Sequence, residues 1–180
     1  MSDARQVVRD YLADNEIEYD ETGAGLFSFS LPGEKKLQTA VRLDVGGHAL
    51  GVHAFVCRKP DENHERVYEW LLQRNLRLYA VSFAVDRLGD IYLDARLPLA
   101  VLDPDDPAEL DRLLGAVLSA ADESFNTILE LGFGSAIRKE WKWRRDRGEP
   151  THNLEAFRGW LEREDASAAG EDQHEGDQRG

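Results

Sequence analysis

The chain has few of the features that would place it outside a cell or inside a membrane. Cys57 is its single cysteine, so an intrachain disulfide is excluded and nothing in the cysteine content indicates secretion. The first residues contain no apolar stretch of signal-peptide type, and no apolar run approaches the roughly 20 residues that span a bilayer. We therefore expect a cytoplasmic protein with no membrane association.

Positive charge is also scarce. The chain has 22 lysines and arginines against 35 acidic residues, which gives a formal net charge of -13. This charge repels phosphate backbones and anionic lipids, and it argues against general binding to nucleic acid. The sequence also has no glycine-rich phosphate loop and no recognisable pairing of a nucleophile with a base. We expect neither an enzyme nor a bound cofactor.

What the sequence does contain is a set of regular hydrophobic patterns that predict an α+β fold. Alternating runs predict five strands of an antiparallel sheet, and apolar residues at helical spacing predict the helices between them. The predicted order is α-βββ-α-ββ-α in a single domain over residues 1–132. The elements are a helix to about Asn15, strands at 26–31, 37–45 and 50–56, a helix at 60–75, strands at 78–85 and 90–97, and a helix from Pro107 to about Leu131.

Three residues mark the ends of these predicted helices. Pro60 opens the central helix, because proline suits a first helical position, and Asn75 suits the left-handed position that closes one. Gly132 is the predicted stop of the long helix. Beyond it we expect a helical extension over residues 133–163, packed on or near the core, and then an acidic disordered tail over residues 164–180.

A metal or thiol site is the first candidate that the residue types raise. His48, His53, Cys57 and His64 are all capable of binding a metal. On a strand, His53 and Cys57 would share one face with Phe55 between them, and His48 would point to the other face. Because this spacing does not bring ligands together, we expect structural or surface roles and no metal site.

A dense polar cluster occupies the passage from the third strand to the central helix, and it includes Arg58 and Lys59. Its acidic members suit the positive end of a helix dipole, which favours a role in capping that helix. The alternative is a recognition edge for a partner protein.

The most unusual string is IRKEWKWRRDRG, from Ile137 to Gly148, whose local net charge is plus four. Trp141 and Trp143 cannot share one face of a helix, so we expect one to pack inward and the other to face out. The helix could pack on its own acidic chain, bind an acidic partner or, third in order, contact nucleic acid. The candidate partner-binding residues are Trp141, Trp143, Arg138, Lys142, Arg144, Arg145, Arg58 and Lys59.

Several strings resemble a known family. The strand run from Leu26 to Val56, the helix VYEWLLQRN and the segment VSFAVDRLGDIYLDARLPL are similar to the YbjN-like family of bacterial domains, and CRKPDENHERVY and FNTILELGF look like its actinobacterial branch. The resemblance covers about Ser2 to Trp160. It implies the fold of type III secretion chaperones, which are homodimers that hold a partner segment in extended form. The family has been labelled as sensory-transduction regulators, and it supplies no catalytic motif to carry over. The basic extension departs from the minimal chaperone fold.

We therefore predict a protein-interaction domain, chaperone-like or regulatory, that acts as a homodimer and offers a hydrophobic groove or a sheet edge to a partner segment. The alternatives are a nucleic-acid regulator that uses the basic helix, and a small-molecule-binding or enzymatic domain with a pocket that the sequence does not reveal.

Overall fold

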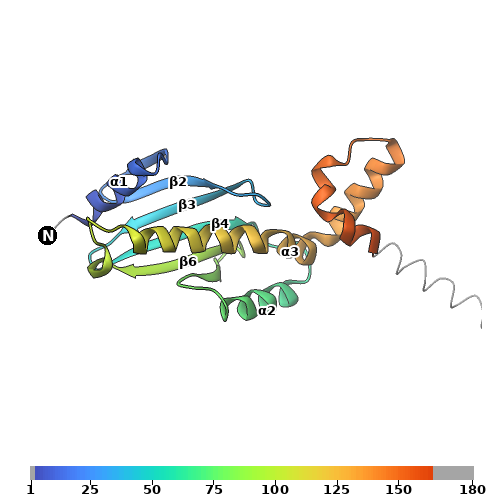
Figure 1. Cartoon of the computed structure of the whole chain (residues 1–180). Coiled ribbons are helices and arrows are strands. Elements are labelled where there is room, and N and C mark those ends of the chain that lie inside the picture. The colour runs from blue at the N-terminus through green and yellow to red at the C-terminus, as the bar shows by residue number, and fades with distance from the viewer. Residues whose placement is uncertain (1–2, 164–180) are drawn as a thin grey trace, which may run out of the picture.

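The computed structural model describes residues 3–163, so the tail predicted at residues 164–180 lies outside the described residues. The described chain forms an antiparallel sheet with helices on one face, and a helical arm, residues 133–163, that leaves the sheet at one end (Figure 1). The elements are α1 (Ala4–Asp14), β1 (Tyr19–Thr22), β2 (Leu26–Pro32), β3 (Gln38–Val45), β4 (Ala49–Cys57), α2 (His64–Asn75), β5 (Ser82–Val85), β6 (Ile91–Pro98), the 3-10 helix η1 (Leu99–Val101), α3 (Ala108–Arg147) and the 3-10 helix η2 (His152–Phe157).

The sheet has the strand order β1-β2-β3-β4-β6-β5, and every pairing is antiparallel. The predicted α+β class and antiparallel sheet are confirmed. The sheet has six strands where the sequence predicted five, because β1 is added at the edge before the first predicted strand. Its sequence, YDET, is mostly polar and three of its four residues are exposed, so it lacks the alternation that marks the other strands.

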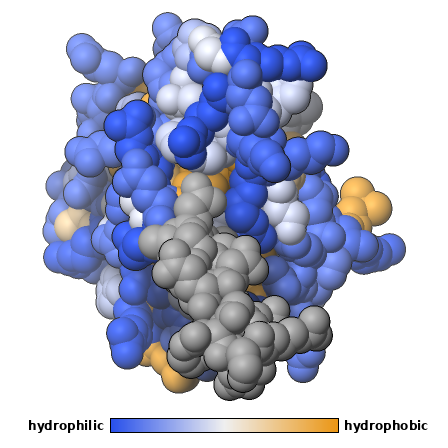
Figure 2. Space-filling view, turned by 90° about the vertical axis from the view of Figure 1, so that its right-hand side faces the viewer, coloured by the Kyte–Doolittle hydropathy of each residue, from blue (hydrophilic) through white to orange (hydrophobic). Residues whose placement is uncertain are grey.

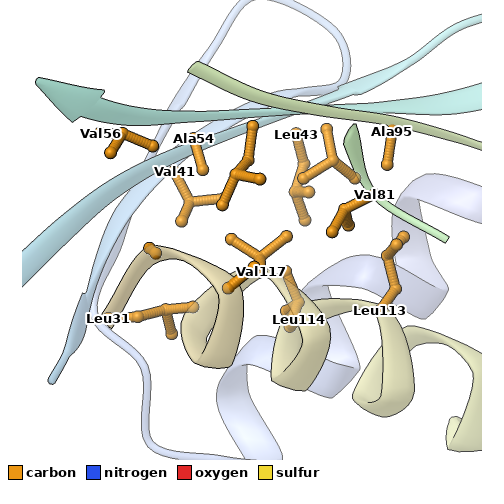
Figure 3. Packing of buried hydrophobic residues seen from close by; sticks show 14 of the residues in the cluster. Leu31, Val41, Leu43, Ala54, Val56, Val81, Ala95, Leu113, Leu114 and Val117 are labelled. Carbon is orange, nitrogen blue, oxygen red and sulfur yellow. The ribbon is translucent and has the colours of Figure 1, made fainter. Parts of the chain in front are cut away.

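The core lies between one face of the sheet and the helices. β3 alternates strictly between exposed and buried residues, as the sequence predicted, and its buried side chains meet α3. In Figure 3, Leu113, Leu114 and Val117 of α3 point toward Val41 and Leu43 of the sheet. α1 and α2 contribute buried residues to the same core, so all three helices cover one face.

Some predicted boundaries are wrong. α2 begins at His64, one turn after Pro60, and the residue before it, Asn63, has left-handed backbone angles (φ 53°). Asn75 is the last residue of α2 and not a left-handed cap, since Leu76 after it keeps right-handed helical angles. β5 is confined to Ser82–Val85, because the chain leaving α2 turns at Ala80 (φ 59°) before it can pair.

α3 does not stop at Gly132. It continues to Arg147, but Phe133 has non-helical angles (φ -138°, ψ 15°), so two helical halves meet at a kink. The sequence predicted that a helix ends at this point, and the structure shows a break within one helix instead. The first half of α3 covers the sheet, and the second half forms the first part of the arm (Figure 1).

The turn between β2 and β3 is fastened to α3 by one carboxylate. Asp122 Oδ1 accepts hydrogen bonds from the backbone amides of Lys35 (2.7 Å) and Lys36 (3.0 Å). A side chain on Gly33 would bring its Cβ within 2.5 Å of the Lys36 carbonyl oxygen and 2.7 Å of Asp122 Oδ1, so this close approach requires glycine.

We predict that Asp122→Ala lowers the free energy of unfolding by about 1–3 kcal/mol, because it removes an ionised acceptor of two amides. Asp122→Asn is the matched control, since its side-chain oxygen can still accept hydrogen bonds, and it should cost less. Urea denaturation followed by circular dichroism measures both values. Equal stabilities of the two variants would contradict this account of the turn.

Candidate interaction surfaces

β4 separates the two residues that the sequence placed on one face. A β-bulge shifts the register between Phe55 and Cys57, and it turns Cys57 into the core while His53 stays on the opposite face of the sheet. Burial raises the pKa of the Cys57 thiol to about 12, which leaves the thiol protonated at neutral pH. The expectation of a shared face is therefore wrong, because the bulge inserts one residue into the alternation.

The uncovered face of the sheet, which we call the open face, carries a polar row across its centre. The row runs through Ser28, Arg42, His53 and Asp94, which are neighbours on successive strands. His53 Nδ1 lies 3.1 Å from an Asp94 carboxylate oxygen. Within residues 3–163, no hydrogen bond or ion pair engages the Arg42 side chain, so its charge is available to a ligand.

A broad hollow of about 1220 Å³ lies beside this row. Phe55 and Tyr92 contribute an edge-to-face aromatic pair to it, with ring centroids 5.4 Å apart. Acidic residues of the loop before β1 stand at its rim. Among the described residues, no group of three or more His, Cys, Asp or Glu side chains is placed to hold a metal ion.

The two edges of the sheet differ. At the β5 edge, Asn75 Oδ1 accepts from the Phe83 amide (2.7 Å) and Asn75 Nδ2 donates to the Phe83 carbonyl (3.2 Å). The end of α2 thus satisfies backbone groups that an added strand would need, and it closes this edge. β1 forms the other edge, and Glu21 there is held by Arg9 of α1.

α2 has a second apolar face that points away from the core. It consists of Leu72, of Leu76 just past the end of the helix, and of the half-buried Tyr68, which also packs against the main core, and we call these three residues the α2 face. Leu72 is 67% exposed and Leu76 is 88% exposed. They border a shallow, almost wholly apolar depression of about 710 Å³. This surface was not predicted from the sequence. The apolar residues of this segment do cover more of the helix than a single buried stripe needs, and that excess is the signal that could have indicated it.

The polar cluster before α2 caps the break in α3 and not α2 itself. The amides of Asp61 and Glu62 donate to the Gly132 carbonyl (2.9 and 3.1 Å), and Asn63 Nδ2 donates to the Leu131 carbonyl (3.0 Å). Asn63 makes no side-chain cap on α2. The loop thus pairs two of the carbonyls at the end of the first half of α3.

The same loop caps the start of the second half of α3. The Glu62 carboxylate accepts from the Ser135 amide (2.5 Å) and from the Ser135 hydroxyl (2.6 Å). Arg58 is paired with Asp61, and its guanidinium lies 4.5 Å from the centroid of the Phe133 ring. We call this set of contacts between residues 58–63 and 131–135 the junction.

The arm has a small core of its own. Trp141 is 7% exposed and packs with Leu154, Phe157 and Leu161 from the segment that folds back after Gly148. The basic helix therefore packs on its own C-terminal segment, although Leu129 and Ile137 border both this cluster and the main core. Trp143 is 42% exposed. The expectation that the two tryptophans face opposite ways is confirmed.

The predicted partner-binding residues do not form one patch. Arg58 is at the junction, and the Lys59 side chain packs beside Gly89 of the β5–β6 turn. Arg144 is paired with Glu140 and donates to the Pro150 carbonyl. Arg138 lies over Trp160 and Arg145 lies over Trp141, both on the packed side of the arm. Only Lys142 and Trp143 are left on its outer side. Figure 2 shows the end that carries the arm, and its surface is largely hydrophilic.

The fold and these surfaces define an α+β domain built on one half-covered antiparallel sheet. The family model described as "putative bacterial sensory transduction regulator", YbjN, matches residues 4–130. The chain therefore belongs to the YbjN family, as its resemblance predicted. No helix among the described residues has both the length and the apolar character needed to cross a membrane.

The chain is similar to several mycobacterial proteins. It is 58% identical to an uncharacterised protein of Mycobacterium leprae over 127 residues, which is 71% of this chain and 67% of that protein. An uncharacterised protein of Mycobacterium tuberculosis is 54% identical over 71% of this chain and 68% of its own length.

Two solved structures also match. The crystal structure of the ExsC–ExsE complex gives a TM-score of 0.48 at 16% identity, over 69% of this chain and 92% of that one. The heterodimeric ExoU–SpcU complex from the type III secretion system of Pseudomonas aeruginosa gives a TM-score of 0.46 at 18% identity, over 68% of this chain and 94% of that one.

We predict that Asn75→Ala destabilises the β5 edge by about 1–3 kcal/mol, because it leaves the partly buried amide and carbonyl of Phe83 unpaired. Asn75→Asp keeps the acceptor for the Phe83 amide and should have a smaller effect. Hydrogen exchange at the Phe83 amide measures the local opening. Unchanged exchange in Asn75→Ala would show that the edge is closed by something else.

We predict that the junction loosens in acid. The hydrogen bonds from Ser135 hold the pKa of Glu62 below its usual 4.5, with Arg138 lowering it further and Asp61 opposing. A lowered pKa means that the carboxylate stabilises the junction fully above pH 4.5, and that this stabilisation is lost as the pH falls through the folded-state pKa. The protection factor of the Ser135 amide, which is its exchange rate corrected for the intrinsic pH dependence of exchange, should fall over that range when it is followed by NMR from pH 6 downward.

Glu62→Gln is the control for this titration. It removes the ionisable group, so the acid-dependent part of the Ser135 exchange should disappear, although exchange at pH 6 should be faster than in the unaltered chain. A titration that persists in Glu62→Gln would assign it to another carboxylate, such as Asp61.

Proposed function

We propose that this chain is a non-enzymatic protein-interaction domain that acts as a homodimer through its α2 face and holds a segment of a partner protein on its open face. The observation that carries the proposal is the α2 face, whose Leu72 and Leu76 are exposed at the C-terminal half of α2 and just beyond it. Burying such an exposed apolar surface is favourable, because it removes apolar area from water.

The size of the effect is sufficient for association. Burying one leucine side chain contributes about 1.5–3 kcal/mol, and a symmetric contact buries Leu72 and Leu76 from both copies. Association also costs rotational and translational freedom, so the contact needs the neighbouring polar rim as well. The α2 face is therefore expected to give a moderate dimer and not an obligate one.

The charges around the α2 face favour an antiparallel arrangement. Glu65 and Glu69 flank its N-terminal half, whereas Gln73 lies beside its C-terminal half and Arg77 follows the helix. Antiparallel packing about a twofold axis sets the acidic half of one helix against the neutral and basic half of the other. A parallel arrangement would place like charges together, which costs free energy.

The open face suits a segment in extended form. Its hollow offers the aromatic pair Phe55 and Tyr92 for apolar side chains, and Arg42 for a carboxylate. The acidic rim favours a segment that also carries a basic residue. Three further statements stay predictions: a cytoplasmic location, the boundary of the sheet domain at residue 132, and the absence of catalysis.

We predict that the double variant L72D/L76D is monomeric at concentrations where the unaltered chain is dimeric, because each aspartate would bring an unpaired charge into the contact. Leu37→Asp is the matched control, since Leu37 is a comparably exposed leucine (73%) in the β2–β3 turn and is not part of the α2 face. Sedimentation equilibrium of the full chain measures the association constant. A monomeric unaltered chain at about 100 μM, an affinity weaker than about 5 kcal/mol, would refute the proposed dimer.

A further inference from the structure

The outer side of the basic helix carries a regular cationic stripe. Lys139, Trp143 and Arg147 are spaced four residues apart, so they lie along one face of the helix, and Lys142 stands beside them. All four are exposed. The Arg147 guanidinium lies 4.6 Å from the centroid of the Trp143 ring, so the two side chains form a cation–π contact along this face. We call these four residues the arm stripe.

Nothing in the described fold accounts for the arm stripe. The opposite side of the same helix is the one that packs, through Trp141, against Leu154 and Phe157. Within residues 3–163, no hydrogen bond or ion pair engages the side chains of Lys139 and Lys142. Asp146 lies beside the stripe on the exposed side, and Glu140, which also borders it, is paired with Arg144, so the three positive charges of the stripe are only partly offset.

We propose that the arm stripe is a docking surface for the acidic C-terminal residues 164–180 of the same chain. These 17 residues carry six carboxylates, at Glu164, Asp165, Glu171, Asp172, Glu175 and Asp177, against the single basic Arg179. In a chain with a net charge of -13, the arm stripe is a place where such a segment meets attraction and not repulsion. This inference does not depend on the proposed dimer.

The geometry allows the contact within one chain. The described residues end at Arg163, in the helical segment that packs on the far side of the basic helix. A helix with its side chains is about 10–12 Å wide, so the path around it is on the order of 20 Å. A segment of this many residues reaches up to about 55 Å when it is fully extended, so its length is sufficient for this path. The tether also gives an effective concentration of about 1 mM or more, which lets weak ion pairs compete with solvent.

Docking of the acidic segment shields the arm stripe from other polyanions. An exposed tryptophan among cations would otherwise be a general site for acidic peptides or for single-stranded nucleic acid. With the segment in place, such ligands must displace it, so their apparent affinity is the intrinsic affinity multiplied by the fraction of chains in which the arm stripe is free. Because the contact consists of ion pairs in water, it weakens steeply as the salt concentration rises.

The test uses the full chain with its six C-terminal carboxylates changed to amides: E164Q, D165N, E171Q, D172N, E175Q and D177N. At low ionic strength, NMR signals of residues 139–147 and of the Trp143 indole should shift in this variant relative to the unaltered chain. Raising the salt to about 500 mM should move the unaltered chain to the same positions, since it releases the same contact. A labelled poly-glutamate peptide should bind the variant about fivefold more tightly, because the competitor is gone.

The matched control changes six exposed carboxylates on the sheet domain to amides and leaves the C-terminal segment intact: D14N, E16Q, E18Q, D20N, E34Q and D44N. It alters the net charge equally, so it should leave the signals of residues 139–147 in place. Two outcomes overturn the proposal. In one, the signals do not respond to the tail substitutions, or they respond equally to the control. In the other, the unaltered chain binds a single-stranded oligonucleotide as tightly as the variant does, which would make the arm stripe an unshielded nucleic-acid surface.

Discussion

The break in α3 at Phe133 is the constraint on which the rest of the arrangement depends. A helix that stops being helical inside a folded protein leaves carbonyls unpaired on one side of the break and amides unpaired on the other. The loop before α2 supplies both sets of partners: Asn63 and two loop amides for the carbonyls, and Glu62 for the Ser135 amide. The first half of α3 can therefore follow the sheet and the second half can leave it, while the Leu131 and Gly132 carbonyls and the Ser135 amide at the break stay hydrogen-bonded.

The contacts at the junction also explain why particular residue types occur at three positions, although nothing in the neighbouring sequence requires them. A side chain at position 132 would put its Cβ 2.8 Å from the Cβ of Pro60, so the loop can reach the Gly132 carbonyl only if this residue is glycine. Gly134 likewise leaves room for the Trp160 ring, whose nearest atom would lie 3.2 Å from a Cβ at that position. The left-handed angles of Asn63 (φ 53°) turn its amide toward α3, and the bonds made there offset that strain. The cluster that looked like a helix cap is thus the contact that sets where the arm begins.

The sequence was sufficient for the parts of the fold that depend on burial. The alternation along β3 and the apolar spacing along the first half of α3 predicted which side chains enter the core, because each pattern is local. Features that depend on a distant partner were missed. β1 is a strand only because β2 offers it an edge, and Cys57 turned inward only because of a bulge. The cap between Glu62 and Ser135 joins residues 73 positions apart, which no local pattern reveals.

Some properties of the candidate surfaces could likewise be predicted from a local pattern, and others could not. The tryptophan pair could be sorted into two faces from helical geometry alone, and the structure then decided that Trp141 is the buried one. Apolar spacing alone does not separate the α2 face from the buried face, because Leu72 lies beside the buried Leu71 in the sequence, although a helix lying on one side of a sheet buries a single face. A strongly acidic chain makes its exposed surface selective, since most of it repels other acidic surfaces. Two of the exceptions among the described residues are an apolar face, to which charge makes little difference, and a cationic stripe, which attracts acidic groups. Salt acts on the two in opposite directions, so it distinguishes the contacts that each one makes.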